Sequence, residues 1–511
     1  MDGVRPFTGG AGGLPAQPAA LPLDEALRLG PQPRIALTGA GGKTTAMFSL
    51  GRRLAQRGAP VCLAATTHLA TAQLGLADRR FTLAPGAPLA APADLLPGQV
   101  LLFTGPQAGG ERTAGLEPAQ IDQLRDWADA LGLALVIEAD GSKRLPLKAP
   151  AAHEPVAPEW VDLVVVTAGL SGVGQPLDEA HVHRPERFAA LSGLALGDPV
   201  TPQALAAVLA HPQGGLYRLP PGARRVALLN QADTPERQAA ARRIAALLQP
   251  AYAAVAIAAL APPAGSSLAA GVQALIEPVA GVILAAGGST RMAAAVAAGA
   301  GAATEESATG AATGAAAGAG GGLSGAAAGE HRVPPGTPKQ LLLWRGRPLV
   351  RHVAEMALRA GLSPVVVVTG SAAEGVAAAL EGLPLQLVHN PDWAAGQSAS
   401  MIAGLRALPD TTGAAVFLLA DQPQIPETLV EALVELHAAG LAPVAAPLVD
   451  GRRANPVLFD RALFPELLAV TGDTGGRALF ARHRPAWLPW HDPSAALDVD
   501  TPADYRRLQE L

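Results

Sequence analysis

Two successive series of short apolar runs, each alternating with stretches of helical spacing, constrain the fold of this chain more than any other feature. The first series begins with RIALTG at residues 34–39, and the second begins with GVILAAG at residues 281–287. Apolar runs that alternate with helices are typical of βαβ units, in which helices cover both faces of a mostly parallel sheet. The sequence therefore predicts an α/β protein with two Rossmann-like three-layer domains. The further strand candidates are PVCLAATT, LALVIEAD, DLVVVTAG and RRVALLN in the first series, and PVVVVTG, LQLVHN, AAVFLLAD and APVAAPL in the second.

The composition between these runs indicates the domain limits. Residues 1–33 are rich in Gly, Ala, Pro and Leu without a sustained period, so we expect a flexible tail with a short helix near Leu23–Leu29. The first domain is predicted over residues 34–277, and it ends with the linker-like stretch APPAGSS and a short helix over Leu268–Ile276. The second domain is predicted over residues 278–511.

An Ala/Gly-rich segment at residues 293–336 interrupts the second domain almost at its start. The segment contains no Phe, Tyr or Trp and no periodic pattern of bulky apolar residues. Such a segment cannot bury enough apolar surface to offset its ordering entropy. We therefore expect a disordered insertion.

Composition excludes several classes of protein. The formal net charge of −5 argues against a nucleic-acid-binding protein, which needs a clustered basic face. No apolar run approaches the roughly 20 residues that span a bilayer, and the start MDGVRPFTGG does not resemble a secretory signal. The single Cys62 excludes a disulfide framework. We expect a soluble, cytoplasmic protein with no nucleic-acid or membrane partner.

Lysine is rare in this chain. Among the 38 basic residues only four are lysines, so Arg supplies nearly every solvated positive charge. Because the compact ammonium of Lys is not interchangeable with a guanidinium, each lysine is a candidate for a specific role. The four are Lys43, Lys143, Lys148 and Lys339.

The first site candidate is TGAGGKTT at residues 38–45, between a predicted strand and a predicted helix. Glycines let backbone N–H groups face an anion, the helix N-terminus adds partial positive charge, and a lysine reaches the terminal phosphates. This context predicts a P-loop-type site for ATP or GTP, with the Thr44 hydroxyl placed to ligate Mg²⁺. The G-x-x-G-K-T-T spacing resembles the loop of Mur-type ligases. The nucleotide-binding candidates are Gly39, Gly41, Gly42, Lys43, Thr44 and Thr45.

Polar residues end three other predicted strands of this domain. LALVIEAD places Glu138 and Asp140 at a strand end, where one carboxylate could orient Mg²⁺ or a water. Asp140 is our candidate metal ligand. The alternative for each residue is a capping or turn carboxylate. ATTH at residues 65–68 could contact nucleotide or substrate at the same sheet edge. NQAD resembles the base-reading motif of GTPases, but Gln231 replaces its lysine, which argues against guanine specificity.

Three motifs of this domain, TGAGGKTT, EADGSKRLPLKAP and GQPLDEAHVHRPERF, resemble the YqeC family of selenium-dependent hydroxylase accessory proteins. The resemblance covers about residues 30–275 and implies an accessory role in maturing a molybdenum hydroxylase, which would be the partner. Three residues of the third motif are candidate substrate contacts, with plain surface positions as the alternative: His181, His183 and Arg184.

The second site candidate is a split signature. If the insertion is excised, GVILAAGGSTRM joins GTPKQLL, and the composite resembles the signature of molybdenum-cofactor nucleotidyltransferases, the MobA-like and MocA-like NTP transferases. A loop that wraps a triphosphate needs glycines, while Arg291 and Lys339 would neutralise charge on the α-phosphate and the leaving pyrophosphate as catalytic residues. The loop residues that we expect to bind nucleotide are Leu284, Ala285, Ala286, Gly287 and Gly288.

Carboxylates for a metal follow the later strands. AVFLLADQPQI ends an apolar strand in Asp421, which we predict to be catalytic and to bind Mg²⁺. ALDVDTPADY supplies the second carboxylate, with Asp500 favoured over Asp498 by its place in the family-like D-x-D-T-P. The resemblance further implies nucleotide contacts at Asn390, Gly396 and Ser400, and acceptor contacts at Asn455, Asp473 and Arg477.

The resemblance implies a reaction of CTP with the molybdopterin cofactor that gives a dinucleotide cofactor and pyrophosphate. LAAG in place of LAGG is more similar to the cytidylyl branch than to the guanylyl branch. Two alternatives stay open at this point. One is a sugar-phosphate or other small-molecule nucleotidyltransferase, and the other is a non-catalytic cofactor carrier or insertion chaperone.

Overall fold

The computed structural model describes most of the chain. The described residues are 20–90, 92, 94–249, 251–264, 268–287, 337–472 and 475–511. Three predicted site residues, Gly288, Arg291 and Asp473, lie outside these ranges, as does the predicted insertion at residues 293–336.

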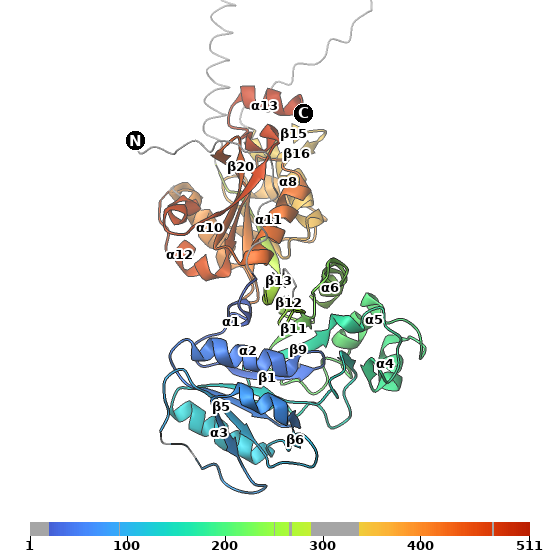
Figure 1. The fold of residues 1–511 in the computed structure, drawn as a ribbon. Coiled ribbons are helices and arrows are strands. Elements are labelled where there is room, and N and C mark those ends of the chain that lie inside the picture. The colour runs from blue at the N-terminus through green and yellow to red at the C-terminus, as the bar shows by residue number, and fades with distance from the viewer. Residues whose placement is uncertain are drawn as a thin grey trace, which may run out of the picture. The chain divides into compact units, whose positions relative to one another are not determined.

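The chain forms two compact units (Figure 1). The first unit reaches Glu277 and includes the short stretch Ala438–Gly440, and the second comprises the rest of the chain from Pro278. Each unit is built on its own sheet. The predicted α/β class is confirmed.

The sheet of the first unit has nine strands in the order β13-β12-β11-β9-β1-β7-β2-β5-β4. All neighbours pair in parallel except β13, which is antiparallel to β12. Parallel strands present their carboxyl ends at one edge, and ligands bind outside that edge in open α/β sheets. The strands are β1 (Arg34–Gly39), β2 (Val61–Ala65), β4 (Arg79–Thr82), β5 (Val100–Thr104), β7 (Ala134–Glu138), β9 (Leu163–Gly169), β11 (Arg224–Asn230), β12 (Ala254–Ala259) and β13 (Gly271–Ile276).

Helices cover this sheet, and side-chain caps fix where several of them begin. Thr201 accepts a hydrogen bond from Ala204 N, and Thr234 accepts one from Arg237 N, each ahead of a proline at the first helical position. The helices are α1 (Leu23–Ala26), α2 (Lys43–Ala55), α3 (Pro118–Ala130), α4 (Pro185–Ser192), α5 (Pro202–Ala210) and α6 (Pro235–Leu248). Two small pairs of strands complete the unit: β3 (Leu69–Ala70) with β6 (Arg112–Thr113), and β8 (Leu147–Lys148) with β10 (Val182–His183).

Two parts of the first unit differ from what the sequence predicts. Within the expected flexible tail, Leu23 and Leu27 are buried and Asp24 pairs with Arg53, so residues 20–33 pack onto the unit. The helix predicted over Leu268–Ile276 is wrong, because β13 occupies residues 271–276 and hydrogen-bonds along β12. A six-residue apolar run is shorter than most helices, and pairing with a buried strand decides its conformation.

The sheet of the second unit runs in the order β18-β17-β14-β19-β22-β20-β21, with β23 pairing to β20. β22 is antiparallel to both of its neighbours, so β14, β17, β18, β19, β20 and β23 all point the same way. The strands are β14 (Val279–Ala285), β17 (Val365–Thr369), β18 (Gln386–His389), β19 (Ala414–Leu419), β20 (Val444–Val449), β21 (Arg452–Arg453), β22 (Val457–Asp460) and β23 (Ala486–Trp490).

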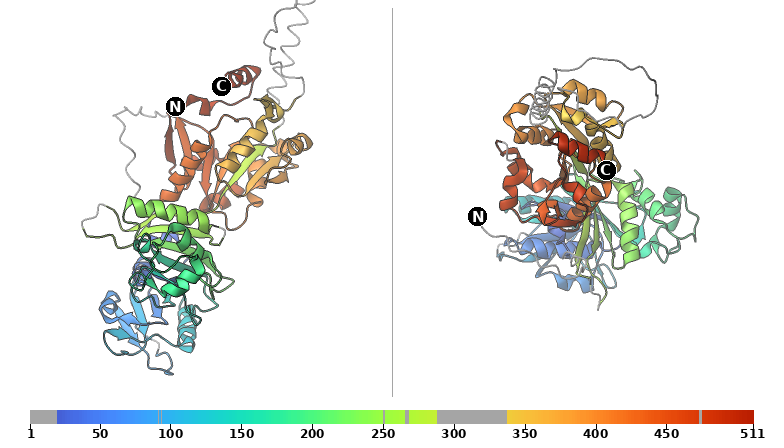
Figure 2. Two further views of the ribbon diagram at one scale, coloured as in Figure 1. Left: turned by 90° about the vertical axis from the view of Figure 1, so that its right-hand side faces the viewer. Right: turned by 90° about the horizontal axis from the view of Figure 1, so that it is seen from above.

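Both faces of this second sheet are buried. Successive residues Val282 and Ile283 of β14 belong to different apolar clusters, one on each face. α10 and α12 cover one face, and α8 and α11 cover the other (Figures 1 and 2). The helices are α8 (Leu349–Arg359), α9 (Ala373–Ala379), α10 (Gln397–Arg406), α11 (Glu427–Gly440), α12 (Phe464–Leu468) and α13 (Pro502–Gln509). Among the described helices, none is both long enough and apolar enough to cross a membrane.

Candidate functional site

The loop between β1 and α2 can be built only with glycines. Gly39, Gly41 and Gly42 have φ angles of 91°, 77° and 130°, in the region that L residues rarely adopt. A Cβ on Gly41 would lie 2.2 Å from the backbone nitrogen of Gly169, and a Cβ on Gly39 would lie 2.2 Å from the carbonyl oxygen of Thr167. The loop is therefore held tightly against β9 and leads directly into the N-terminus of α2 at Lys43.

Lys43 is buried behind this loop. Its Nζ donates a hydrogen bond of 2.6 Å to the Gly39 carbonyl and lies 3.3 Å from Asp140 Oδ1, and its side chain is 3% exposed. A buried ammonium needs such partners, because an uncompensated buried charge is strongly destabilising. The lysine is thus held by the same loop whose anion we expect it to bind.

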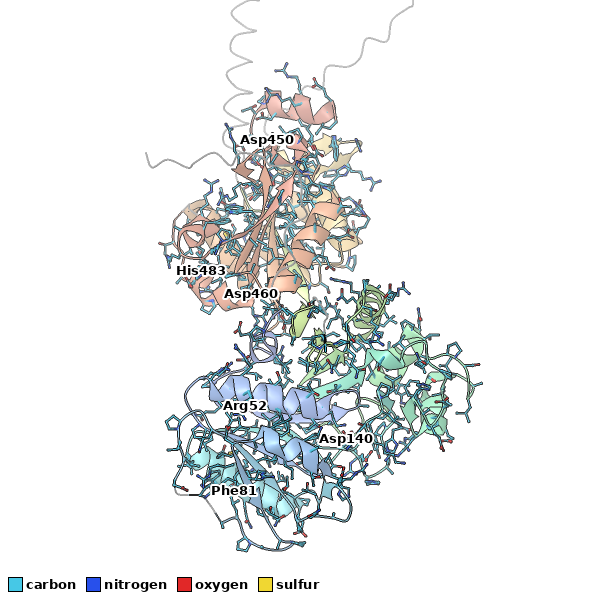
Figure 3. All side chains as sticks on the ribbon, viewed as in Figure 1. Arg52, Phe81, Asp140, Asp450, Asp460 and His483 are labelled. Carbon is cyan, nitrogen blue, oxygen red and sulfur yellow. The ribbon has the colours of Figure 1, made fainter. Side chains whose placement is uncertain are left out.

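Two carboxylates at the end of β7 take different roles. The Thr44 hydroxyl donates a hydrogen bond of 2.8 Å to Glu138 Oε2. Asp140 (Figure 3) instead accepts hydrogen bonds from Lys148 Nζ at 2.7 Å and from Gly39 N at 3.1 Å. The structure therefore places Glu138, and not the candidate ligand Asp140, beside the Thr44 hydroxyl.

Burial is the dominant influence on Glu138. It raises the pKa of that carboxyl, while Lys43 and the Thr44 hydroxyl act in the opposite direction. A carboxylate that is buried and faces a pocket through a threonine hydroxyl is suited to hold a cation when one is supplied.

The second and third motifs of this unit meet at Glu154. Its Oε2 accepts Lys148 Nζ at 3.0 Å and Arg184 Nη1 at 2.9 Å. Burial alone would raise the pKa of Glu154, but the two cations outweigh it and lower the pKa to about 2. Burial and the cations Arg184, Lys148 and Lys143 lower the pKa of His183 to about 4. His181 instead pairs at 2.7 Å with Asp178.

A pocket of about 400 Å³ lies beside the loop between β1 and α2. It collects residues from the carboxyl ends of several parallel strands, as the sheet topology requires. The neighbouring Asn230 fixes the loop by donating a hydrogen bond of 2.9 Å to the Gly41 carbonyl. Sequence reasoning missed Arg112, which reaches the pocket from β6 and carries no local signal. The lining comprises Gly41–Thr45, Thr67, His68, Ala70, Gln73, Arg112, Glu138, residues 141–144, Glu154, His183 and Gln231.

The second unit brings together the predicted catalytic lysine and both predicted metal ligands. Lys339 Nζ forms an ion pair with Asp421, which follows β19, and lies 2.9 Å from Asp500 Oδ1. Burial would lower the pKa of Lys339, but the two aspartates outweigh it and raise the pKa. We call Lys339, Asp421 and Asp500 the lysine–aspartate cluster.

A third carboxylate stands next to this cluster. Burial raises the pKa of Asp498, and the neighbouring charges of Asp421 and Asp500 raise it further. Gln422 donates a hydrogen bond to Asp498. The sequence favoured Asp500 over Asp498 as the metal ligand, and the structure pairs Asp500 with Lys339 and Asp498 with the Gln422 amide.

The two halves of the split signature meet at the end of β14. Gln340 Nε2 donates hydrogen bonds of 3.3 Å to the Ala285 carbonyl and 3.5 Å to the Gly287 carbonyl. The Ser371 hydroxyl donates to the same Gly287 oxygen at 3.1 Å. Leu284 lies in β14, and Ala286 is buried directly after it. Sequence reasoning missed Gln340 and Ser371, although Gln340 stands within the quoted motif.

The remaining predicted residues of this unit differ in accessibility. Asn390 and Ser400 are buried and bonded to each other at 3.0 Å, whereas Gly396 begins α10 with φ 110°. Asn455 precedes a cis peptide bond to Pro456. Burial first and then Arg477 lower the pKa of Arg453, which places these two cations close together at the end of β20.

The lysine–aspartate cluster fits a divalent cation. In the described part of the chain, no group of three or more His, Cys, Asp and Glu side chains could hold a metal ion. Mg²⁺, however, is usually bound by one or two carboxylates together with substrate phosphates, not by a complete protein cage. Asp421 and Asp500 already converge on one ammonium group, so this donor set suits a cation shared with a triphosphate.

Comparison with known protein families divides the chain in the same way. The model of the YqeC protein family matches residues 35–186, and the model of the MobA-like NTP transferase domain matches residues 321–486. The uncharacterized protein YqeC of Escherichia coli is 34% identical over 241 residues, which is 46% of this chain and 88% of that protein. Nicotine blue oxidoreductase of Paenarthrobacter nicotinovorans is 37% identical over 181 residues, which is 34% of this chain and 87% of that protein.

Among solved structures, Rv0371c of Mycobacterium tuberculosis H37Rv matches 46% of this chain and 98% of its own, at 25% identity and a TM-score of 0.35. The two family matches agree with the two units of the fold. The chain belongs to the YqeC family through its first unit and to the MobA-like NTP transferases through its second, and it is a nucleotidyltransferase.

Proposed function

We propose that the second unit transfers CMP from CTP to the molybdopterin form of the molybdenum cofactor and releases pyrophosphate. The observation that carries the proposal is the lysine–aspartate cluster beside the loop that follows β14. The reaction needs positive charge at the phosphates and carboxylates for a metal, and the cluster offers both on neighbouring side chains.

In this proposal Asp421 and Asp500 would hold Mg²⁺, which supplies charge neutralisation for the triphosphate when it is bound. Lys339, released from its two aspartates, would bind the phosphates, and Arg291 would act with it. An oxygen of the cofactor's terminal phosphate attacks the α-phosphorus while the bond from that phosphorus to the pyrophosphate oxygen breaks. Pyrophosphate leaves with the electron pair.

The nucleotide side of the proposal rests on the loop and on relatives. LAAG at residues 284–287 is similar to the cytidylyl branch. 3-Deoxy-manno-octulosonate cytidylyltransferase of Xanthomonas axonopodis is 32% identical over 183 residues, which is 65% of that protein. Backbone groups of Ala286 and Gly287 and the α10 N-terminus at Gly396 would contact CTP. Asn390 and Ser400, which are buried, would position that helix.

The acceptor side is proposed around the hairpin that follows β20. Asn455, Arg477 and Asp473 are our candidates for the pterin phosphate, and Arg453 joins them. Two neighbouring guanidinium groups repel each other, which an anionic acceptor would relieve. Guanidinium forks also match phosphate geometry.

For the first unit we propose binding of ATP or GTP at the phosphate loop, with Thr44 and a strand-end carboxylate holding Mg²⁺. The hydrogen bond from Thr44 to Glu138 favours Glu138 for that second role, and Asp140 would then position Lys43 and Lys148. The fused module would serve the maturation of a molybdenum hydroxylase, the proposed partner, in the cytoplasm.

A second candidate function comes from one relative. Nicotine blue oxidoreductase is named for an oxidoreductase activity, and it is 37% identical to this chain over 181 residues. Oxidation or reduction of nicotine blue would not require a lysine held between two aspartates. The lysine–aspartate cluster therefore favours nucleotidyl transfer over this alternative.

The experiment that tests the proposal incubates the protein with Mg²⁺, isolated molybdopterin cofactor and each NTP in turn, followed by mass analysis of the product. We expect a cytidine dinucleotide cofactor and pyrophosphate with CTP. Transfer only to sugar phosphates would favour a different acceptor class. A change in the absorbance of nicotine blue with an added redox partner, without pyrophosphate release, would favour the oxidoreductase.

A further inference from the structure

The pocket beside the phosphate loop is lined by more residues than the binding of a nucleotide phosphate requires. Gly41–Thr45 form one part of that lining, and Arg112 and the segment 141–144 form another. The volume of about 400 Å³ lies within the range of small-molecule sites, roughly 300–1,000 Å³. The Leu145 carbonyl of the motif GSKRLP accepts a hydrogen bond of 3.2 Å from Gly41 N, whereas residues 141–144 of the same motif have no role in the proposed nucleotide site.

Three cations of this lining have no partner among the residues that the structure describes. The side chains of Arg112, Lys143 and Arg144 form no ion pair and no hydrogen bond within that part of the chain, and all three residues are exposed. By contrast, Lys148 of the same motif and Arg184 of the motif GQPLDEAHVHRPERF are both paired with Glu154. The pocket therefore has positive charge that the protein itself does not neutralise.

The two carboxylates that line the pocket cannot supply that neutralisation. Glu138 accepts the Thr44 hydroxyl, and Glu154 already accepts Lys148 and Arg184. His183, also in the lining, has its pKa lowered to about 4 by burial and by neighbouring cations that include Lys143. The pocket is thus an environment that favours an anion.

The backbone that carries two of these cations has an unusual conformation. Lys143, Arg144 and Gln231 have φ angles of 51°, 64° and 66°, and all three line the pocket. Non-glycine residues adopt this conformation at an energetic cost, and it persists where the surrounding structure imposes it, often at ligand sites. Two consecutive strained residues with unneutralised side chains indicate a wall that is organised before a ligand arrives.

We propose that Arg112, Lys143 and Arg144 bind a second small molecule, a carboxylate or phosphate oxyanion, beside the nucleotide. The inference rests on the proposed nucleotide site at the phosphate loop. Guanidinium forks and ammonium groups both bind these oxyanions. The first unit is then a two-substrate site in which the anion lies next to the terminal phosphate of the nucleotide, and not a nucleotide-binding module alone.

The test is isothermal titration calorimetry on the full chain, saturated with the β,γ-imido analogue of ATP and titrated with inorganic phosphate or, separately, with succinate. The two probes distinguish a phosphate ligand from a carboxylate ligand. We expect saturable binding of at least one probe, weakened at least tenfold in Lys143→Gln/Arg144→Gln. The matched control Arg80→Gln/Arg243→Gln removes two exposed arginines outside the pocket and should change the affinity less than twofold.

The same titrations without nucleotide separate the two proposals. If the protein does not bind the nucleotide analogue but binds the anion through Lys143 and Arg144, the proposed nucleotide site is refuted and the anion site is supported. The inference is overturned if neither probe binds saturably, or if the double variant and its control bind alike. An unchanged melting temperature verifies that the double variant is folded. If the double variant does not fold, Arg112→Gln, which lies outside the strained segment, is used for the same titrations.

Discussion

Removing the charge of Asp140 should destabilise the first unit without touching its apolar core. The side chains of Asp140, Lys43 and Lys148 are 2%, 3% and 3% exposed, so Asp140→Asn leaves two buried ammonium groups with one anion fewer. Breaking a buried pair costs about 3–5 kcal/mol. Because asparagine keeps one acceptor oxygen and Lys148 keeps Glu154, we expect the lower end of that range, about 3 kcal/mol.

Hydrogen exchange read by mass spectrometry on the full chain measures this cost, because peptides of the second unit serve as an internal reference. A loss of about 3 kcal/mol raises the exchange rate of the slowest amides in β1 and β7 by roughly 100-fold. The control Asp126→Asn breaks an exposed pair with Arg125, for which about 1 kcal/mol or less is expected. If both variants exchange within about fivefold of each other, the reasoning about a buried charge cluster is wrong.

Three further predictions concern the two sites. Lys43→Ala should remove one of two nucleotide sites by calorimetry yet leave CMP transfer unchanged; loss of transfer would point to one composite site. Because the pKa of His183 is about 4 in the folded chain against an ordinary 6.5, the unfolded chain takes up a proton first, so the free energy of unfolding should fall as pH decreases from 6.5 to 4. In thermal melts across this pH range, His183→Gln should lessen the fall in stability. The same dependence of stability on pH in the variant and the wild type would refute this role of His183. Joining Met292 to Thr337, which deletes residues 293–336, should leave the transfer rate and the melting temperature unchanged, because loop closure entropy changes slowly with length. A folded protein that no longer binds nucleotide would contradict the split signature.

The sequence predicted the fold class and the glycine-rich loop between β1 and α2 because both depend on local physics. Buried strands read as apolar runs, and RIALTG and RRVALLN coincide with β1 and β11 residue for residue. The loop glycines are required by positive φ angles and by the close approach of the loop to β9. The spacing of the glycines in the sequence indicated such a loop. The strands β5 and β12 were not among the candidates, although both are apolar runs.

The parts that the sequence could not predict depend on contacts between distant segments. Glu138 and Asp140 both follow β7, and only the contacts with Thr44 and Lys148 separate their roles. Arg112 reaches the pocket from a two-residue strand that has no periodic pattern. The same holds for β13, whose strand conformation is imposed by pairing with β12.

The central claim, that the lysine–aspartate cluster is the centre of nucleotidyl transfer, is tested most directly by pyrophosphate release from CTP and molybdopterin cofactor in Asp421→Asn at saturating Mg²⁺. Asparagine keeps the shape of the aspartate side chain but lacks its negative charge. That charge pairs with Lys339 in the structure and would hold the metal. Loss of one such electrostatic contact typically costs about 100-fold to 1,000-fold in rate, so we expect at least a 100-fold loss. The control Asp410→Asn, exposed ahead of β19 at the opposite end of that strand, should keep full activity. Retention of a tenth or more of the wild-type rate by Asp421→Asn would contradict the claim.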